Sequence, residues 1–117
     1  MAERLKKAKS IAGYTQKTLS EKTGISLSTI NELESGHRNM IYLDTLLKLL
    51  TVLDKNILCD DYCNFILNQK DNLKNFLDIY GINQLSQKLS IHRSSIERWK
   101  NGKYQVSRKY YELLERL

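Results

Sequence analysis

The chain has 117 residues, of which 41% are hydrophobic and 27% charged, a composition ordinary for a soluble globular protein. Its length allows one compact domain or two very small ones. No apolar run approaches the roughly 20 residues that span a bilayer, and the charged N-terminal sequence MAERLKKAKS lacks the apolar core of a secretion signal, so we expect a cytoplasmic protein without a membrane partner. The net charge of +6 indicates a polyanionic partner such as nucleic acid, although lysines also serve merely to solubilise a surface.

The positions of the helix-breaking residues predict an all-α fold. The chain has no proline, and its five glycines fall at expected helix ends or turns, which is typical of helical proteins with short connections. The first helix should run from residue 2 or 3 to residue 12, where Gly13 ends it. The apolar residues expected on its inner face are Leu5, Ala8 and either Ile11 or Ala12.

Residues 16–36, QKTLSEKTGISLSTINELESG, are the most informative stretch. Thr15 and Ser26 are placed to cap two short helices that end near residues 23 and 34. Gly24 supplies the left-handed backbone of the turn between them, and the small Ser20 lets the second helix pack closely over the first. This combination is typical of DNA-binding helix-turn-helix units.

The second of these helices, residues 26–34, is expected to read DNA. With Ile30 and Leu33 facing inward, steps of about 100° per residue place four side chains on the outer side and a fifth, that of Leu27, on its flank. Short polar groups bond base edges, a glutamate accepts from the cytosine amino group, and a leucine contacts the thymine methyl. The alternative is an ordinary solvated face. The five residues are Leu27, Ser28, Asn31, Glu32 and Ser35.

Four further residues near these helices are expected at the DNA backbone. Gln16 has two candidate roles, because its amide can bond a phosphate or brace the reading helix. Glu34 falls close to the inner face, where an unpaired carboxylate is costly, and Lys9 on the first helix is the obvious ion-pair partner. The four residues expected at the DNA backbone are Gln16, Lys17, Arg38 and Asn39.

A leucine-rich helix follows, and after it a connector. Cys59 and Cys63 lie one helical turn apart in this connector, a poor geometry for a disulfide, so we expect two buried thiols. The two histidines, His37 and His92, are far from them in sequence, and neither a metal site nor a cofactor is expected. The connector should span residues 56–70. Helical spacing gives the preceding helix one apolar face, made of Leu43, Leu46, Leu47, Leu50 and Leu53.

Residues 71–117 contain a second copy of the motif. The sequence LSQKLSIHRSSIERWKNG at 85–102 aligns without gaps with LSEKTGISLSTINELESG at 19–36, and a repeat of this quality is not expected by chance. Ser90 replaces the turn glycine, His92 replaces the capping serine, and Asn83 is expected to cap the helix before the turn. The sequence thus predicts two tandem helix-turn-helix bundles, 1–55 and 71–117, joined by the helical connector 56–70.

The second copy carries more positive charge than the first. Residues 67–117 hold ten Lys and Arg against five Asp and Glu, whereas residues 1–66 hold nine against eight. Arginine suits bidentate reading of guanine and the binding of phosphate, so DNA contact is one reading of this copy. The alternatives are that it binds a protein or only packs. The residues expected to contact DNA are Arg93, Ser94, Arg98, Lys100 and Lys103.

Residues 3–54 resemble the Xre/Cro-type, phage-repressor-like helix-turn-helix family. Members of that family often have a proline before the fourth helix, where this chain has Met40 and Ile41. The second copy resembles the same family only loosely. The resemblance rests on TQ at 15–16, LSEKTGIS at 19–26, STI at 28–30, LESG at 33–36 and LDTLLKLL at 43–50.

The resemblance implies a set of roles and an assembly. Gln16 would contact or organise the phosphate backbone, and Lys9 would pair with Glu34. Family members bind palindromic operators as dimers and act as repressors or activators. The residues that would read the major groove are Leu27, Ser28 and Glu32.

The function expected from these features is that of a sequence-specific, double-stranded DNA-binding transcriptional regulator. We expect a repressor that acts as a homodimer, of the kind found in phages, mobile elements and bacterial operons. The alternative is an anti-defence or antitoxin-type protein whose second copy binds a partner protein. An enzyme is not expected, because the sequence offers no nucleophile with its base, no phosphate-cradling loop and no metal cluster.

Overall fold

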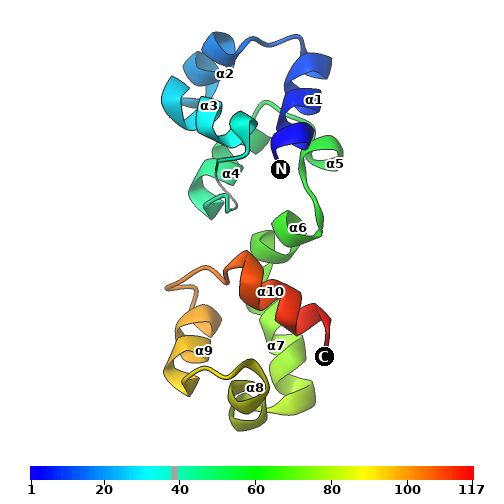
Figure 1. Cartoon of the computed structure of the whole chain (residues 1–117), viewed down its shortest axis with the longest axis vertical. Helices are drawn as coiled ribbons and strands as arrows, with labels where there is room; N and C mark the ends of the chain where they lie inside the picture. Colours follow the sequence, from blue (N-terminus) through cyan, green and yellow to red (C-terminus); the bar gives the residue numbers. More distant parts are fainter. Residues whose placement is uncertain (38–39) are drawn as a thin grey trace. The chain divides into compact units, whose positions relative to one another are not determined.

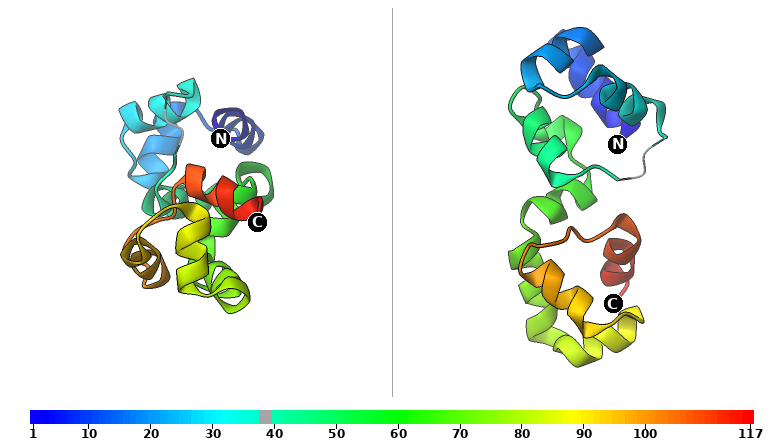
Figure 2. Two further views of the ribbon diagram at one scale, coloured as in Figure 1. Left: turned by 60° about the horizontal axis from the view of Figure 1, so that its bottom comes forward. Right: turned by 90° about the vertical axis from the view of Figure 1, so that its left-hand side faces the viewer.

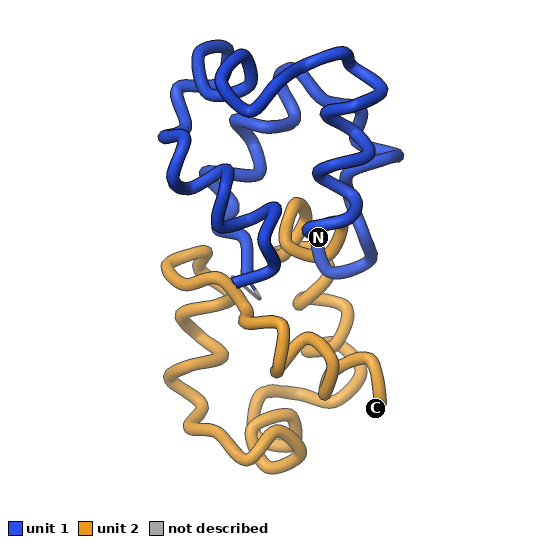
Figure 3. Tube along the Cα trace, turned by 45° about the horizontal axis from the view of Figure 1, so that its top comes forward, with its two compact units in different colours: residues 1–63 blue, residues 64–117 orange. Residues whose placement is uncertain are grey.

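The computed structural model describes residues 1–37 and 40–117, and the described residues form helices joined by short loops, without a strand (Figure 1). The all-α fold predicted from the sequence is therefore confirmed. The chain divides into two compact units, which we call unit 1 (Met1–Cys63) and unit 2 (Asn64–Leu117; Figure 3). This division falls within residues 56–70, the segment expected to connect the two bundles.

Unit 1 consists of short helices whose ends follow the capping residues of the sequence. Gly13 ends the first helix in a left-handed conformation, with φ of 77°. Thr15 Oγ1 accepts from the Thr18 amide at 3.1 Å and so caps the second helix. The bounds are α1 (Ala2–Ala12), α2 (Gln16–Thr23), α3 (Leu27–Ser35), α4 (Leu43–Leu50) and α5 (Lys55–Leu58), and α6 (Asp61–Leu67) begins here and continues into unit 2.

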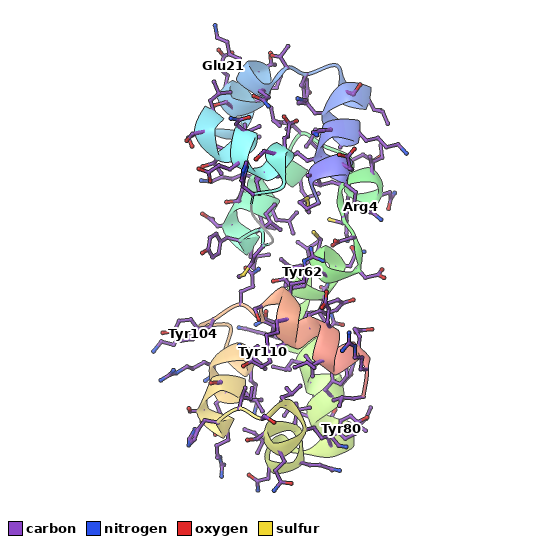
Figure 4. All side chains as sticks on the ribbon, viewed as in Figure 1. Arg4, Glu21, Tyr62, Tyr80, Tyr104 and Tyr110 are labelled. Carbon is purple, nitrogen blue, oxygen red and sulfur yellow. The ribbon has the colours of Figure 1, made fainter. Side chains whose placement is uncertain are left out.

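The core of unit 1 is made by apolar residues from each of its helices. α1 packs against α3 and α5, and Arg4, labelled in Figure 4, donates from Nη1 to the carbonyls of Ile57 at 3.4 Å and Cys59 at 3.1 Å. These bonds satisfy carbonyls at the end of α5. The core residues that are no more than 2% exposed are Leu5, Ala8, Leu19, Ile30, Leu33, Ile41, Leu46, Leu49, Leu58, Tyr62 and Cys63.

Two expectations about the core of unit 1 were wrong. Ile11 is 63% exposed and Ala12 is exposed as well, because α1 packs through Leu5 and Ala8 and its last turn lies outside that contact. Leu47 is 50% exposed, whereas Leu49 is fully buried. In a helix with leucine at five of its eight positions, spacing alone fits more than one inward face, and packing selects one of them.

The two cysteines are free thiols and buried, as expected. They do not lie one turn apart in a single helix, because Cys59 follows α5 with an extended backbone and Cys63 lies in α6. Asp60 Oδ1 accepts from the Cys63 amide at 2.9 Å. Burial raises the pKa of the Cys63 thiol to about 12, and the negative charge of Asp60 adds to this effect. Burial also raises the pKa of Cys59. Both side chains are therefore protonated near neutral pH, the form that is a poor nucleophile and a poor metal ligand.

Unit 2 is a smaller helical bundle, in which α7 packs against both α8 and α9 (Figure 2). From α6, Phe65 packs against Tyr111, with ring centroids 5.2 Å apart. The bounds are α7 (Gln69–Tyr80), α8 (Ile82–Leu89), α9 (Arg93–Lys100) and α10 (Arg108–Glu115). The buried apolar residues of unit 2 are Phe65, Ile66, Leu73, Leu85, Leu89, Ile96, Trp99, Val106 and Leu114.

The start of α8 differs from the expectation. α8 begins at Ile82, and Asn83 is inside the helix rather than capping it. Gly81, with φ of 76° and ψ of 159°, ends α7 and starts α8 at a single residue. Glycine takes this positive φ without the clash of a side chain, which allows such a short connection between the two helices.

No helix among the described residues is long and apolar enough to cross a membrane.

Candidate nucleic-acid interface

The turn between α2 and α3 is fixed by two local features. Gly24 has φ of 76° and ψ of 4°, the left-handed conformation expected for it. Ser20 Oγ donates to the Ile25 carbonyl at 2.6 Å, so the small side chain both allows a close approach and bonds across the turn. Ser26 Oγ then accepts from the Thr29 amide at 3.2 Å and caps α3. These contacts set the direction in which α3 leaves the turn.

α3 buries one face and exposes the other, in agreement with its helical period. Ile30 and Leu33 are 0% and 2% exposed and anchor the inner face. All five residues expected on the outer face are exposed, and Leu27, with 48% exposure, is the apolar one. The outer residues are Leu27, Ser28, Asn31, Glu32 and Ser35.

Local hydrogen bonds distinguish two of the outer hydroxyl groups. Ser35 Oγ donates to the Glu32 carbonyl at 2.9 Å and lies 2.6 Å from His37 Nδ1. Ser28 Oγ has a longer contact, 3.3 Å, with Ser26 Oγ. The Ser35 hydroxyl is thus engaged within the chain, and contact with a base would compete with its two present bonds.

Three polar side chains hold α3 against α1 and α2. Glu34, on the inner side of α3, is only 5% exposed. Its Oε1 lies 2.6 Å from Lys9 Nζ, and its Oε2 accepts a hydrogen bond from Gln16 Nε2. The predicted Lys9–Glu34 pair is confirmed, and of the two roles considered for Gln16 the structure shows the bracing one. This buried carboxylate, paired with Lys9 and hydrogen-bonded by Gln16, holds α3 in place. Its removal would leave the charge of Lys9 without its partner.

Of the other three residues expected at the DNA backbone in unit 1, the structure describes one. Lys17 is exposed in the first turn of α2. Arg38 and Asn39 lie outside the described residues.

Unit 2 reproduces the turn of unit 1 between α8 and α9. Ser86 Oγ donates to the Ile91 carbonyl at 2.5 Å, as Ser20 does to Ile25. Ser90 takes the left-handed φ of 55° in the place of Gly24, and it is the only described non-glycine residue with positive φ. His92 Nδ1 accepts from the Ser94 amide at 3.1 Å and caps α9. The substitutions in the second copy therefore preserve the backbone geometry.

The residues expected to contact DNA in unit 2 lie on α9 and the loop after it. Arg93 is exposed and forms an ion pair with Glu97, Nη2 to Oε1 at 3.8 Å. Arg98 lies over the ring of Tyr104, 5.6 Å from the centroid. Ser94 is half-buried rather than exposed, and its hydroxyl lies 2.8 Å from His92 Nδ1. The exposed members are Arg93, Arg98, Lys100 and Lys103.

One positioning residue of unit 2 was missed by the sequence analysis. Gln69, at the start of α7, donates from Nε2 to the carbonyls of Trp99 at 3.1 Å and Tyr104 at 2.9 Å. Its Oε1 accepts from the Val106 amide at 2.9 Å. A single amide thereby fixes the loop after α9. Its partners lie 30 to 37 residues away in sequence, so no local pattern could have identified it.

Comparison with known proteins gives a match for the first part of the chain. No match was found among curated proteins or solved structures. Residues 2–56 match the family model described as a helix-turn-helix domain. This range contains the turn at Gly24, the exposed face of α3 and the Lys9–Glu34–Gln16 brace. Residues 2–56 are therefore similar to helix-turn-helix domains, a class of domain typical of DNA-binding regulators.

Proposed function

We propose that this protein is a sequence-specific regulator of transcription that binds double-stranded DNA and reads the major groove with α3. The observation that carries the proposal is the exposed, largely polar face of α3 on a helix held by a buried ion pair. The protein acts by binding, and no catalytic step is part of the proposal.

The exposed side chains of α3 are of the kinds that contact base edges at the floor of the major groove. The major groove of B-DNA admits an α-helix and presents donors, acceptors and the thymine methyl at its floor. Ser28 and Asn31 can bond base edges, Glu32 can accept from a cytosine amino group, and Leu27 can contact a methyl. Ser35 is the weakest candidate because its hydroxyl is engaged with Glu32 and His37.

Contacts to the DNA backbone would fix the register of α3. Lys17 is exposed at the start of α2, where it can approach a phosphate. Arg38 and Asn39 are proposed for the same task. Gln16 acts mainly through Glu34, since its amide already bonds that carboxylate.

The resemblance to Xre/Cro-type regulators supports a finer proposal. A homodimer would present two α3 helices to the halves of a palindromic operator, about 34 Å apart along the duplex. Occupancy of a promoter by such a dimer would block transcription, so we propose a repressor. The setting that fits is the cytoplasm of a bacterial host, with the gene in a phage, mobile element or operon.

Selection of DNA by the purified full chain tests this proposal. Fragments that bind should converge on a shared sequence, and footprinting should place protection in the major groove. Ser28→Ala combined with Glu32→Ala should lower affinity for the selected duplex by about tenfold or more, with a small effect on random duplex. Lys17→Ala is the control, which should weaken binding to both duplexes alike. Equal losses on both duplexes for the Ser28/Glu32 variant would contradict base reading by α3.

A further inference from the structure

We propose that unit 2 is a second duplex-binding surface, which binds the phosphates of the DNA backbone and supplies most of the electrostatic attraction while α3 selects the sequence. We call this surface the α9 basic surface. The proposal rests on the duplex proposed above as the partner of α3, and adds a site with a different task. The α9 basic surface consists of Arg93, Arg98, Lys100 and Lys103.

The net charge of the chain is concentrated around α9. Residues 93–109 hold six Lys and Arg and a single acidic residue, while the whole chain has a net charge of +6. The corresponding residues of unit 1, 27–43, hold one arginine and two glutamates. Clustered positive charge is the electrostatic footprint of binding to the nucleic-acid backbone.

The basic side chains lie where phosphates would be. With Ile96 and Trp99 buried, helical periodicity places Arg93 and Lys100 toward one edge of the exposed face of α9, and Arg98 on the exposed face itself, where Glu32 lies in α3. The floor of a major groove carries base edges, and phosphates line both of its rims. The positive charge at the edge of α9 therefore matches a rim of the groove rather than its floor.

The equivalent positions of α3 have the opposite character. Leu27 stands in the place of Arg93, and Glu32 in the place of Arg98. Glu34 stands in the place of Lys100, but it is buried and paired with Lys9. None of these three side chains of α3 attracts a phosphate. The same helical scaffold thus presents a reading face in unit 1 and a phosphate-binding face in unit 2.

Part of the α9 basic surface is held in place before any ligand binds. Gln69 bonds the carbonyls of Trp99 and Tyr104, so it fixes both ends of the segment that carries Lys100 and Lys103. The Arg98 guanidinium lies over the ring of Tyr104, the residue labelled in Figure 4. Side chains and loops that are already ordered lose less entropy on binding, which favours affinity.

A protein partner is the competing occupant of this region. A pocket of about 260 Å³ lies beside α9, lined in part by Trp99, Tyr104 and Tyr110. An aromatic side chain of a partner protein would enter this pocket and stack on its rings. The concentration of positive charge favours the duplex, because a polyanion engages the whole α9 basic surface whereas an aromatic side chain engages only the pocket.

The salt dependence of binding by the full chain tests the proposal. The probes are a random-sequence duplex of about 30 base pairs, long enough for three turns, and the duplex recovered by selection. Arg98→Gln combined with Lys103→Gln should reduce the slope of log K against log salt by about 2 on both probes. The ratio of the two affinities should stay constant. Lys74→Gln combined with Lys88→Gln, which removes the same charge from exposed positions of α7 and α8, should leave the slope unchanged.

Two results would overturn the proposal. One is a folded Arg98/Lys103 variant, verified by circular dichroism, that keeps the wild-type slope on both probes. The other is a slope equally reduced by the Lys74/Lys88 control, which would indicate diffuse attraction without a defined surface. If Ser28 and Glu32 still control sequence preference in either case, the role of α3 stands and only the second surface fails. Absence of binding to both probes would remove both proposals.

Discussion

α3 and α9 have the same local geometry and opposite surface charge. In each, a serine hydroxyl bonds an isoleucine carbonyl across the turn, at 2.6 Å in unit 1 and 2.5 Å in unit 2. A residue with positive φ lies between the serine and the isoleucine, Gly24 in unit 1 and Ser90 in unit 2. On the exposed side, Glu32 of α3 corresponds to Arg98 of α9. The residues that fix the backbone of the turn are therefore separate from those that set the charge of the exposed face. Either set can change without altering the other.

The two units also differ in how they hold the exposed helix. Unit 1 uses a buried ion pair, in which Glu34 is 5% exposed and lies 2.6 Å from Lys9. Unit 2 uses the neutral amide of Gln69, which bonds the loop after α9. A buried ion pair depends on both partners, because either charge left alone in the interior is costly. We therefore expect unit 1 to be more sensitive to loss of one side chain.

The largest expected effect is the loss of the buried ion pair. Lys9→Met would leave the Glu34 carboxylate buried without its counterion, and we expect the free energy of unfolding of unit 1 to fall by about 3 kcal/mol. Urea unfolding followed by circular dichroism measures this change. Lys7→Met, at an exposed position of the same helix, is the control, with an expected change within about 0.5 kcal/mol. Similar values for the two variants would show that the pair does not stabilise the fold.

Removal of the Gln69 amide should have the next largest effect. Gln69→Leu leaves one carbonyl of α9, and one carbonyl and one amide of the loop after it, without the bond from Gln69. We expect a loss of about 2 kcal/mol in unit 2. The fluorescence of Trp99, the single tryptophan, reports unfolding of this unit. Gln84→Leu, at an exposed position on α8, is the matched control. An unchanged midpoint for Gln69→Leu would mean that water replaces the lost bonds.

Conversion of α3 toward the charge pattern of α9 should alter DNA binding by a smaller amount. Glu32→Arg should strengthen binding to random duplex by about tenfold at low salt, since one added phosphate contact raises the salt slope by about 0.9. Preference for the selected sequence should fall at the same time. Titration of both duplexes at several salt concentrations measures the two quantities. Greater affinity confined to the selected duplex would contradict the separation of tasks between α3 and α9.

The smallest expected effect concerns the turn of unit 2. Ser90 has φ of 55°, a conformation that strains a residue with a side chain and that glycine adopts freely. Ser90→Gly should therefore stabilise unit 2 by about 0.5 kcal/mol, after the greater chain entropy of glycine offsets part of the gain. The reverse substitution, Gly24→Ser, should destabilise unit 1 by a similar amount. Thermal unfolding of the two variants measures both changes in stability. Destabilisation by Ser90→Gly would show that the serine side chain contributes more than the backbone strain costs.

The tertiary structure decided what the local pattern left ambiguous. Leu47 and Leu49 both fit a leucine-rich amphipathic helix, yet the first is 50% exposed and the second fully buried. Ile11 has helical spacing from Ala8 but lies outside the contact of α1 with its neighbours. The engagement of Ser35 with His37, and of Gln69 with the loop after α9, depends on side-chain positions that periodicity does not contain.

The sequence by itself determined the all-α fold, the two turns and the outward face of α3. These features follow from local rules, because glycine positions, capping side chains and a period of about 3.6 residues act over a few neighbouring positions. The repeat at 85–102 likewise predicted a second turn, which Ser90 adopts in spite of its side chain. Which leucines are buried, and which polar groups bond across the fold, was decided only when distant segments packed together, since those contacts exist between helices and not within them.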